Sequence, residues 1–173
     1  MSCLNGEQDS EGGSRGRLPG WLLVVLASVV VGIDQFTKWL VIAHLQRGEF
    51  IRLCSFVKIR HTDNTGIAFG LWADGGRALP LLAAVCIVLL LLWGSRYARQ
   101  SGVVGWSLAL LVGGALGNMV DRIRVGRVTD FIDVSFWPVF NFADACVVIG
   151  ALMLLMHGLF LHKPAGCAKV GDE

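Results

Sequence analysis

Four long apolar segments dominate the sequence and set the class of fold. They cover residues 21–45, 78–94, 103–120 and 143–161. Each approaches the roughly 20 residues that an α-helix needs to cross a hydrocarbon core of about 30 Å. The chain is 54% hydrophobic and 16% charged, whereas soluble domains carry about 25% charged residues. The pattern therefore predicts an all-α membrane protein with four transmembrane helices.

The first segment has two possible interpretations, because its opening run of thirteen apolar residues, Trp21–Ile33, is also typical of a signal peptide. No small-residue cleavage site follows this run, and the apolar pattern resumes after Asp34, Gln35 and Lys38. We therefore expect one spanning helix over 21–45 with a polar turn on one face. The third segment carries a stripe of small residues, Gly113 to Gly117, whose spacing lets a neighbouring helix approach closely.

The remaining segments divide the chain further. Residues 46–77 alternate apolar and polar positions and end in several glycines, which predicts a small extracytoplasmic β-rich element between helices 1 and 2. Residues 121–142 contain aromatic side chains of the kind that favour the headgroup interface. We expect a single membrane domain over 21–162, with cytoplasmic tails over 1–20, which we expect to be disordered, and 163–173.

Charge and composition exclude some function classes. The net charge of +2 provides no strong basic field for nucleic acid. The five cysteines and four histidines are scattered, and none shows the spacing of metal ligands. We therefore expect no nucleic-acid partner and no bound metal.

Ionisable residues in apolar segments are candidates for function, because they are costly to insert. Asp34 and Lys38 are four residues apart, so they face the same side of a helix and are expected to form a structural ion pair. Asp121 and Arg122 are expected to close the third helix, with Arg122 as an interfacial anchor. Alternatively, Asn118 and Arg122 on one face could hold the carbonyls of an extended peptide.

Asp130 and Asp144 form the strongest catalytic candidate. They flank the loop between the third and fourth segments, so antiparallel helices would bring both carboxylates to one membrane face. Two carboxylates at one site share a proton, and such a pair can activate water and polarise a carbonyl group. Asp144 could instead simply cap a helix, because Asn141 and Asp144 have the spacing of a capping box. Spacing alone leaves both interpretations open.

Four blocks of sequence resemble lipoprotein signal peptidase, also called signal peptidase II, over roughly residues 21–160. They are Asp34–Lys38, Asn64–Gly70, Gly117–Ile132 and Phe140–Asp144. The resemblance implies that Asp130 and Asp144 are catalytic. It also implies a substrate site shaped by Asn64, Gly66, Asn118, Arg122, Asn141 and Ala143, with Asp34, Lys38 and Asp121 as supporting polar residues.

The same resemblance implies a substrate and a location. The family removes the signal peptide of diacylglyceryl-modified prolipoproteins just before the lipidated cysteine, without metal or cofactor, and is inhibited by globomycin. It implies a monomeric multi-pass protein among the lipids of the bacterial inner membrane, with both termini cytoplasmic and the active site on the periplasmic face. The positive-inside rule does not favour this orientation, because the outer segments carry more Lys and Arg than the inner ones.

Three other functions agree less well with the sequence. A small transporter or channel would place acidic residues near mid-membrane in symmetric positions, and the sequence has no internal repeat. A non-catalytic lipid-binding subunit would have no need of both Asp130 and Asp144. A cysteine protease would need a third catalytic residue beside Cys54 and His61, and none is evident.

Overall fold

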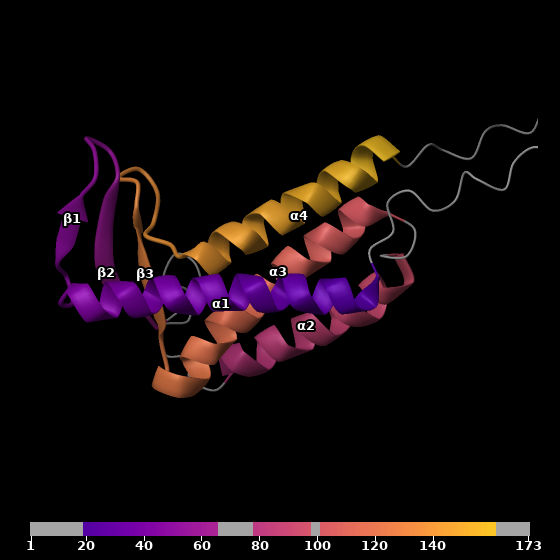
Figure 1. Cartoon of the computed structure of the whole chain (residues 1–173), viewed down its shortest axis with the longest axis horizontal. Helices are drawn as coiled ribbons and strands as arrows, with labels where there is room; N and C mark the ends of the chain where they lie inside the picture. The colour runs from indigo at the N-terminus through magenta and orange to yellow at the C-terminus, as the bar shows by residue number, and fades with distance from the viewer. Residues whose placement is uncertain (1–18, 66–77, 98–100, 162–173) are drawn as a thin grey trace, which may run out of the picture.

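The computed structural model of the chain describes residues 19–65, 78–97 and 101–161. In this part of the chain, four helices run alongside one another and a small sheet covers one end of the bundle (Figure 1). The helices are α1 (Gly20–His44), α2 (Ala78–Tyr97), α3 (Gly102–Val125) and α4 (Phe142–Leu161). The strands are β1 (Phe50–Arg52), β2 (Lys58–Asn64) and β3 (Val128–Asp133).

Helix α3 is the centre of the bundle and contacts α1, α2 and α4. The small-residue stripe makes these contacts close, as predicted. A Cβ atom added at Gly113 would lie 2.7 Å from the Val30 Cβ atom on α1. One added at Gly114 would lie 2.5 Å from the Ala143 carbonyl oxygen on α4. Glycine at these positions therefore lets α1 and α4 pack directly against the α3 backbone.

Three of the helices are long and apolar enough to cross a membrane: α1, α3 and the Phe142–Phe160 part of α4. The apolar part of α2 is shorter and covers Leu81–Gly94. Large apolar side chains are exposed along the helices, for example Val24, Leu89 and Leu155. An outward apolar surface of this kind is suited to lipid rather than water.

The sheet differs from its prediction in one respect. Its strands are antiparallel in the order β1-β2-β3, and the third strand comes from the segment between α3 and α4. The prediction of a β-rich element limited to 46–77 was therefore incomplete. Strand β3 is short and contains two aspartates, so its sequence does not show a clear strand pattern. Its partner β2 lies more than sixty residues away, so the pairing could not be predicted from local sequence. The buried residues Val41, Leu45 and Phe131 seat this sheet on the end of α1.

The end of α3 also differs from its prediction. Asp121 and Arg122 do not close the helix, which continues to Val125 and stops at Gly126. Gly126 adopts φ 75°, and its N–H donates to the Arg122 carbonyl at 3.0 Å. This left-handed residue is a common helix terminator. The helix therefore ends at the glycine that can adopt this conformation, and the polar residues Asp121 and Arg122 do not end it.

Some predictions concern residues outside the described part of the chain. They are the tail over 1–18, the loop over 66–77 with Gly66, and the tail over 162–173.

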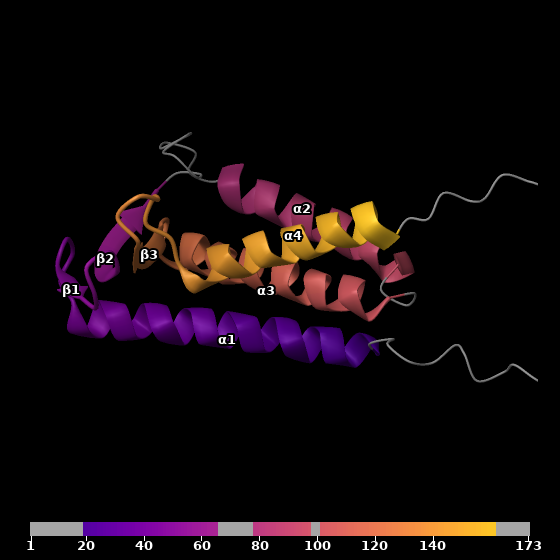
Figure 2. The same cartoon turned by 90° about the horizontal axis from the view of Figure 1, so that it is seen from above.

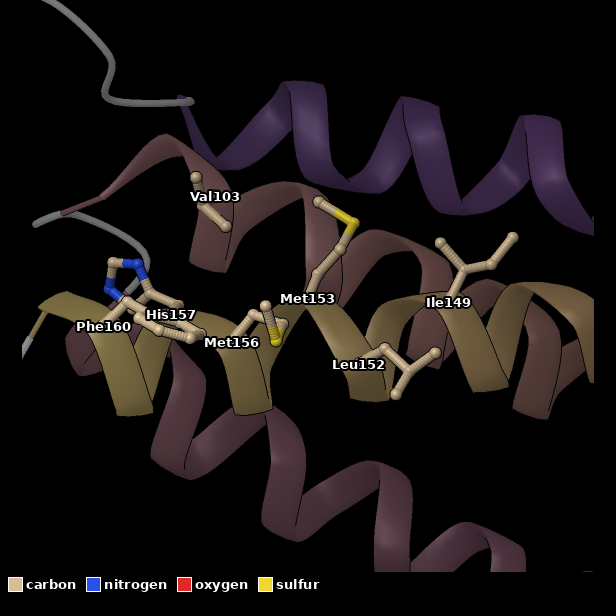
Figure 3. Close-up of a pocket in the computed structure, with 7 residues that line it drawn as sticks. All are labelled: Val103, Ile149, Leu152, Met153, Met156, His157 and Phe160. Carbon is tan, nitrogen blue, oxygen red and sulfur yellow. The ribbon is translucent and has the colours of Figure 1, made fainter.

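Two apolar hollows lie away from the aspartates. One, of about 440 Å³, is lined by Val103 of α3 and by side chains from Ile149 to Phe160 of α4 (Figure 3). The other, of about 520 Å³, lies between α1, α2 and α3 and extends to Val120. Neither is lined by a carboxylate, so both are apolar surfaces separate from the acidic residues.

We predict that Gly114→Ala destabilises the bundle by about 1–3 kcal/mol, because the new methyl group would force α3 and α4 apart. Gly158→Ala is the matched control, since a Cβ at Gly158 meets nothing within 4 Å. Thermal unfolding in detergent would measure both variants. An equal melting temperature for the two variants would contradict the close packing of α4 on Gly114.

Candidate active site

Asp130 and Asp144 lie together at the sheet end of the bundle. Asp130 is on β3, and Asp144 is in the first turn of α4. Asn141 connects them: its Nδ2 atom donates to Asp130 Oδ1 at 2.7 Å, and its backbone N–H donates to Asp144 Oδ2 at 3.3 Å. Both carboxylates therefore accept hydrogen bonds from one residue in the turn between β3 and α4.

Each carboxylate accepts a further hydrogen bond from another part of the chain. Asn64 Nδ2 on β2 donates to Asp130 Oδ2 at 2.9 Å, and Asn118 Nδ2 on α3 donates to Asp144 Oδ1 at 2.7 Å. The pairing of β2 with β3 places Asn64 opposite Val128, two residues before Asp130. Asp130 is almost fully buried and Asp144 is half-buried. The two aspartates thus have the same kind of donors but different access to solvent.

The predicted capping box is present at the start of α4. The Asp144 backbone N–H donates to Asn141 Oδ1 at 2.9 Å, and the Asn141 N–H donates back to Asp144 Oδ2. A helix N-terminus favours a negative charge. The capping bonds leave the Asp144 carboxyl group half-buried, so capping and a catalytic role are compatible.

A buried ion cluster lies next to the two aspartates. Lys38 Nζ is 2.8 Å from Asp34 Oδ2, which confirms the predicted pair, and also 2.8 Å from Asp121 Oδ2 on α3. The Asp34 Oδ1 atom accepts the Ala143 backbone N–H of α4 at 3.0 Å. Lys38, Asp34 and Ala143 are all nearly inaccessible to solvent. The cluster therefore connects α1, α3 and α4.

Sequence reasoning gave no role to Gln35. Its Nε2 atom donates to Asp121 Oδ1 at 2.9 Å, to the Gly117 carbonyl at 3.2 Å and to Asp34 Oδ2 at 3.3 Å. The side chain thus holds both carboxylates that flank Lys38. Gln35 is adjacent to Asp34 in the sequence, and neighbouring residues on a helix do not share a face, so spacing gave no signal for this contact.

The other predicted site residues are placed as follows. Arg122 is half-buried on α3 and interacts electrostatically with Asp144, Asp130 and Asp121. Asn118 donates a hydrogen bond to Asp144, and Asn141 donates one to Asp130. The Ala143 N–H donates to Asp34. Gly66 lies outside the described residues. The structure therefore brings the described candidates together around one pair of carboxylates.

The electrostatics distinguish Asp130. Burial raises the pKa of Asp130 from 3.8 to about 6. The negative charge of Asp144 raises this pKa as well, whereas the hydrogen bonds from Asn64 and Asn141 and the charge of Lys38 lower it. Since loss of hydration penalises the charged form, burial outweighs the amide donors, and Asp130 holds a proton more readily than an exposed aspartate.

Three arginines of the segments that were predicted to lie on the outer side form ion pairs at the sheet. Arg47 Nε and Arg127 Nε are 2.9 and 3.2 Å from Asp63 Oδ2, and Arg60 Nε is 3.4 Å from Asp133 Oδ2. These pairs join β2 to its neighbours beside the carboxylates. Part of the positive charge of these segments is therefore neutralised within the sheet, which weakens a topology argument based on counting Lys and Arg.

Comparison with known proteins identifies the family. The family model described as "Signal peptidase (SPase) II" matches residues 26–160, most of the chain. The chain belongs to the signal peptidase II family. It is therefore an integral membrane peptidase that removes the signal peptide from prolipoproteins.

Individual relatives of this signal peptidase II family member are similar to it in sequence along nearly their whole length. A lipoprotein signal peptidase of Halothermothrix orenii is 39% identical over 87% of this chain and 100% of its own. One from Moorella thermoacetica is 37% identical over 83% and 94%. A bacterial membrane enzyme solved by the in meso method at 2.3 Å resolution has a TM-score of 0.79 at 25% identity, over 88% of this chain and 98% of its own.

We predict that Lys38→Met lowers the free energy of unfolding by about 3–5 kcal/mol, because it leaves two buried carboxylates without their cation. Arg52→Met, at an exposed position of β1, is the control and should change stability by about 0.5 kcal/mol or less. Unfolding in detergent would measure both. Unchanged melting of Lys38→Met would show that the ion cluster does not stabilise the bundle.

The raised pKa of Asp130 predicts a pH dependence of stability. The folded protein binds the proton more tightly than the unfolded chain, so this contribution is fully present below about pH 4 and is lost as pH rises through 6. The loss amounts to about 3 kcal/mol for a shift of roughly two pKa units. Asp130→Asn removes it and keeps the other titrating groups. The stability of wild type relative to this variant should fall between pH 4 and pH 7, and a constant difference would contradict the shift.

Proposed function

We propose that Asp130 and Asp144 are the catalytic dyad of this signal peptidase. The observation that carries the proposal is the attachment of both carboxylates to Asn141, with further amide donors from Asn64 and Asn118. Such donors fix the two carboxyl groups relative to each other before substrate binds. Pre-oriented groups lower the entropy cost of reaction. The chemistry is that of an aspartyl peptidase.

The two aspartates have different roles in the proposed mechanism. Asp130 holds the shared proton and polarises the scissile carbonyl group, because burial raises its pKa. Asp144, at the N-terminus of α4, acts as the general base and removes a proton from the attacking water. The water oxygen then bonds to the carbonyl carbon, and the proton taken by Asp144 passes to the leaving amine as the peptide bond breaks.

The proposed substrate is a diacylglyceryl-modified prolipoprotein, cut immediately before the lipidated cysteine. Its acyl chains remain in the bilayer while the peptide reaches the dyad, which lies where the sheet meets the helices (Figure 2). Confinement to the membrane replaces part of the entropy cost of a bimolecular encounter. Asn64, Gly66, Asn118, Arg122, Asn141 and Ala143 are the residues that we propose to shape the substrate site, and a globomycin-type peptide would compete for it.

We also propose that all four helices cross the membrane within a single domain over 21–162. Helix α2 has 20 residues, a length of about 30 Å. Helix α1 begins and α4 ends at the end of the bundle away from the sheet (Figures 1 and 2), as an even number of crossings requires. Both termini are then cytoplasmic, and the sheet and dyad face the periplasm across the bacterial inner membrane.

We predict that Asp130→Asn and Asp144→Asn each lower cleavage of a lipid-modified prolipoprotein by at least about a thousandfold, as expected when one of two interdependent groups is lost. A gel-shift assay in detergent would measure it. Asp133→Asn is the matched control: it removes a carboxylate of the same strand that forms an ion pair with Arg60 and accepts the Ser135 N–H instead, and it should keep activity. Cleavage by either dyad variant at the control's rate would exclude the dyad.

A further inference from the structure

Asn118 joins the buried ion cluster to the carboxylate pair through a single carboxamide. Its Oδ1 atom accepts from Lys38 Nζ at 3.0 Å and from Asn141 Nδ2 at 3.1 Å. Its Nδ2 atom donates to Asp144 Oδ1 at 2.7 Å. The oxygen of this amide therefore faces donors, and its nitrogen faces an acceptor.

The two ends of a carboxamide have nearly the same shape, so its orientation is decided by its partners. Of the three partners of Asn118, Asp144 can change its character, because it becomes a donor when protonated. The Asn141 amide is held as a donor, because its oxygen accepts the Asp144 backbone N–H. The Lys38 ammonium can only donate, and it is the one charged donor among the three. Lys38 therefore sets the strongest requirement for an oxygen opposite it.

We propose that Lys38 is a positioning residue: by binding Asn118 Oδ1, it holds the Asn118 N–H group as a hydrogen-bond donor to Asp144. The proposal rests on the proposed function of Asp144. Lys38 itself does not touch either aspartate of the dyad in this scheme. It acts through the orientation of one side chain, in addition to its role in the stability of the bundle.

The position of Lys38 suits this role because the ammonium is held on several sides. Asp34 and Asp121 each bind it at 2.8 Å, and the Lys38 side chain is 3% exposed. Gln35 in turn donates to both of these carboxylates. The cation therefore has a fixed place, and the atom that binds it must be an acceptor.

The orientation set at Asn118 extends to the second carboxylate. Because Asn118 presents its oxygen to Asn141, Asn141 donates there through Nδ2 and uses the same nitrogen for Asp130 Oδ1 at 2.7 Å. The Asn141 oxygen is left to accept the Asp144 backbone N–H at 2.9 Å. The amide orientation that Lys38 requires at Asn118 thus agrees with the orientation that the Asp144 backbone N–H requires at Asn141.

The chemical consequence concerns the proton. A donor at Asp144 Oδ1 favours its ionised form, whereas an amide oxygen at the same place would favour the protonated form. Losing the orientation should therefore make Asp144 protonate at higher pH. Within the described part of the chain, the charged groups near the dyad include Asp34 and Lys38 from α1, Asp121 and Arg122 from α3, and Asp63 from β2, which is paired with Arg47 and Arg127.

A double-mutant cycle separates the amide from the bare charge of Lys38. Infrared spectroscopy would follow the protonated carboxyl band of Asp144 against pH, with the band assigned by its absence in Asp144→Asn. Lys38→Met should raise the titration midpoint by about one pH unit, a tenfold change in the ratio of protonated to ionised Asp144. In the Asn118→Ala background the same substitution should shift the midpoint far less, because only the direct effect of charge remains.

Equal shifts in the two backgrounds, or no shift in either, would overturn the proposal. If Lys38→Met fails to fold, Asp34→Asn/Lys38→Met takes its place, because it removes one charge of each sign and leaves Asp121 bound to Gln35 and the Thr129 N–H. The infrared titration needs no turnover. If Asp144→Asn still cleaved substrate, the proposed function would fail, while the titration would still decide how Asn118 is oriented.

Discussion

The ammonium of Lys38 is buried between two carboxylates and an amide oxygen where α1, α3 and α4 meet. A charge at this depth is stable only when it is paired and hydrogen-bonded, so the helices that carry its partners must stay together. Asp34 also connects the ion cluster to α4, because its Oδ1 atom accepts a hydrogen bond from the Ala143 N–H. Such contacts need closely packed backbones. Gly117 lies against Asp34 and Gly114 against Ala143, so the ion cluster and the small-residue stripe of α3 depend on each other.

The sheet adds a second constraint from outside the bundle. Asp130 belongs to a strand, and its donor Asn64 belongs to the neighbouring strand β2. The residue before Asn64 is Asp63, which two arginines hold in place. These ion pairs are partly exposed, and exposed pairs contribute little to stability. Their effect is on position: they hold the end of β2 beside the dyad, where a small displacement would break the bond from Asn64 to Asp130.

The sequence predicted the parts of this structure that depend on local spacing. The apolar segments gave the helices, the separation of four residues gave the Asp34–Lys38 pair, and the separation of three gave the capping box of Asn141 and Asp144. It did not predict the contacts that depend on how distant elements meet. The pairing of strand 128–133 with β2, the bond from Lys38 to Asp121 and the two bonds of Gln35 to Gly117 and Asp121 all join residues far apart in the chain. In each case the partner is set by packing, which leaves no period in the sequence.

The internal hydrogen bonds fix the Asp130 and Asp144 carboxyl groups at all four of their oxygens. Among the described residues, Asp130 accepts from Asn141 and Asn64, and Asp144 accepts from Asn118 and from the Asn141 backbone N–H. These donors lie on β2, on α3 and in the turn before α4, so the two carboxyl groups keep their relative position only while the sheet and the helices stay together. A site with fewer internal donors would leave buried carboxylates free to turn or to protonate together.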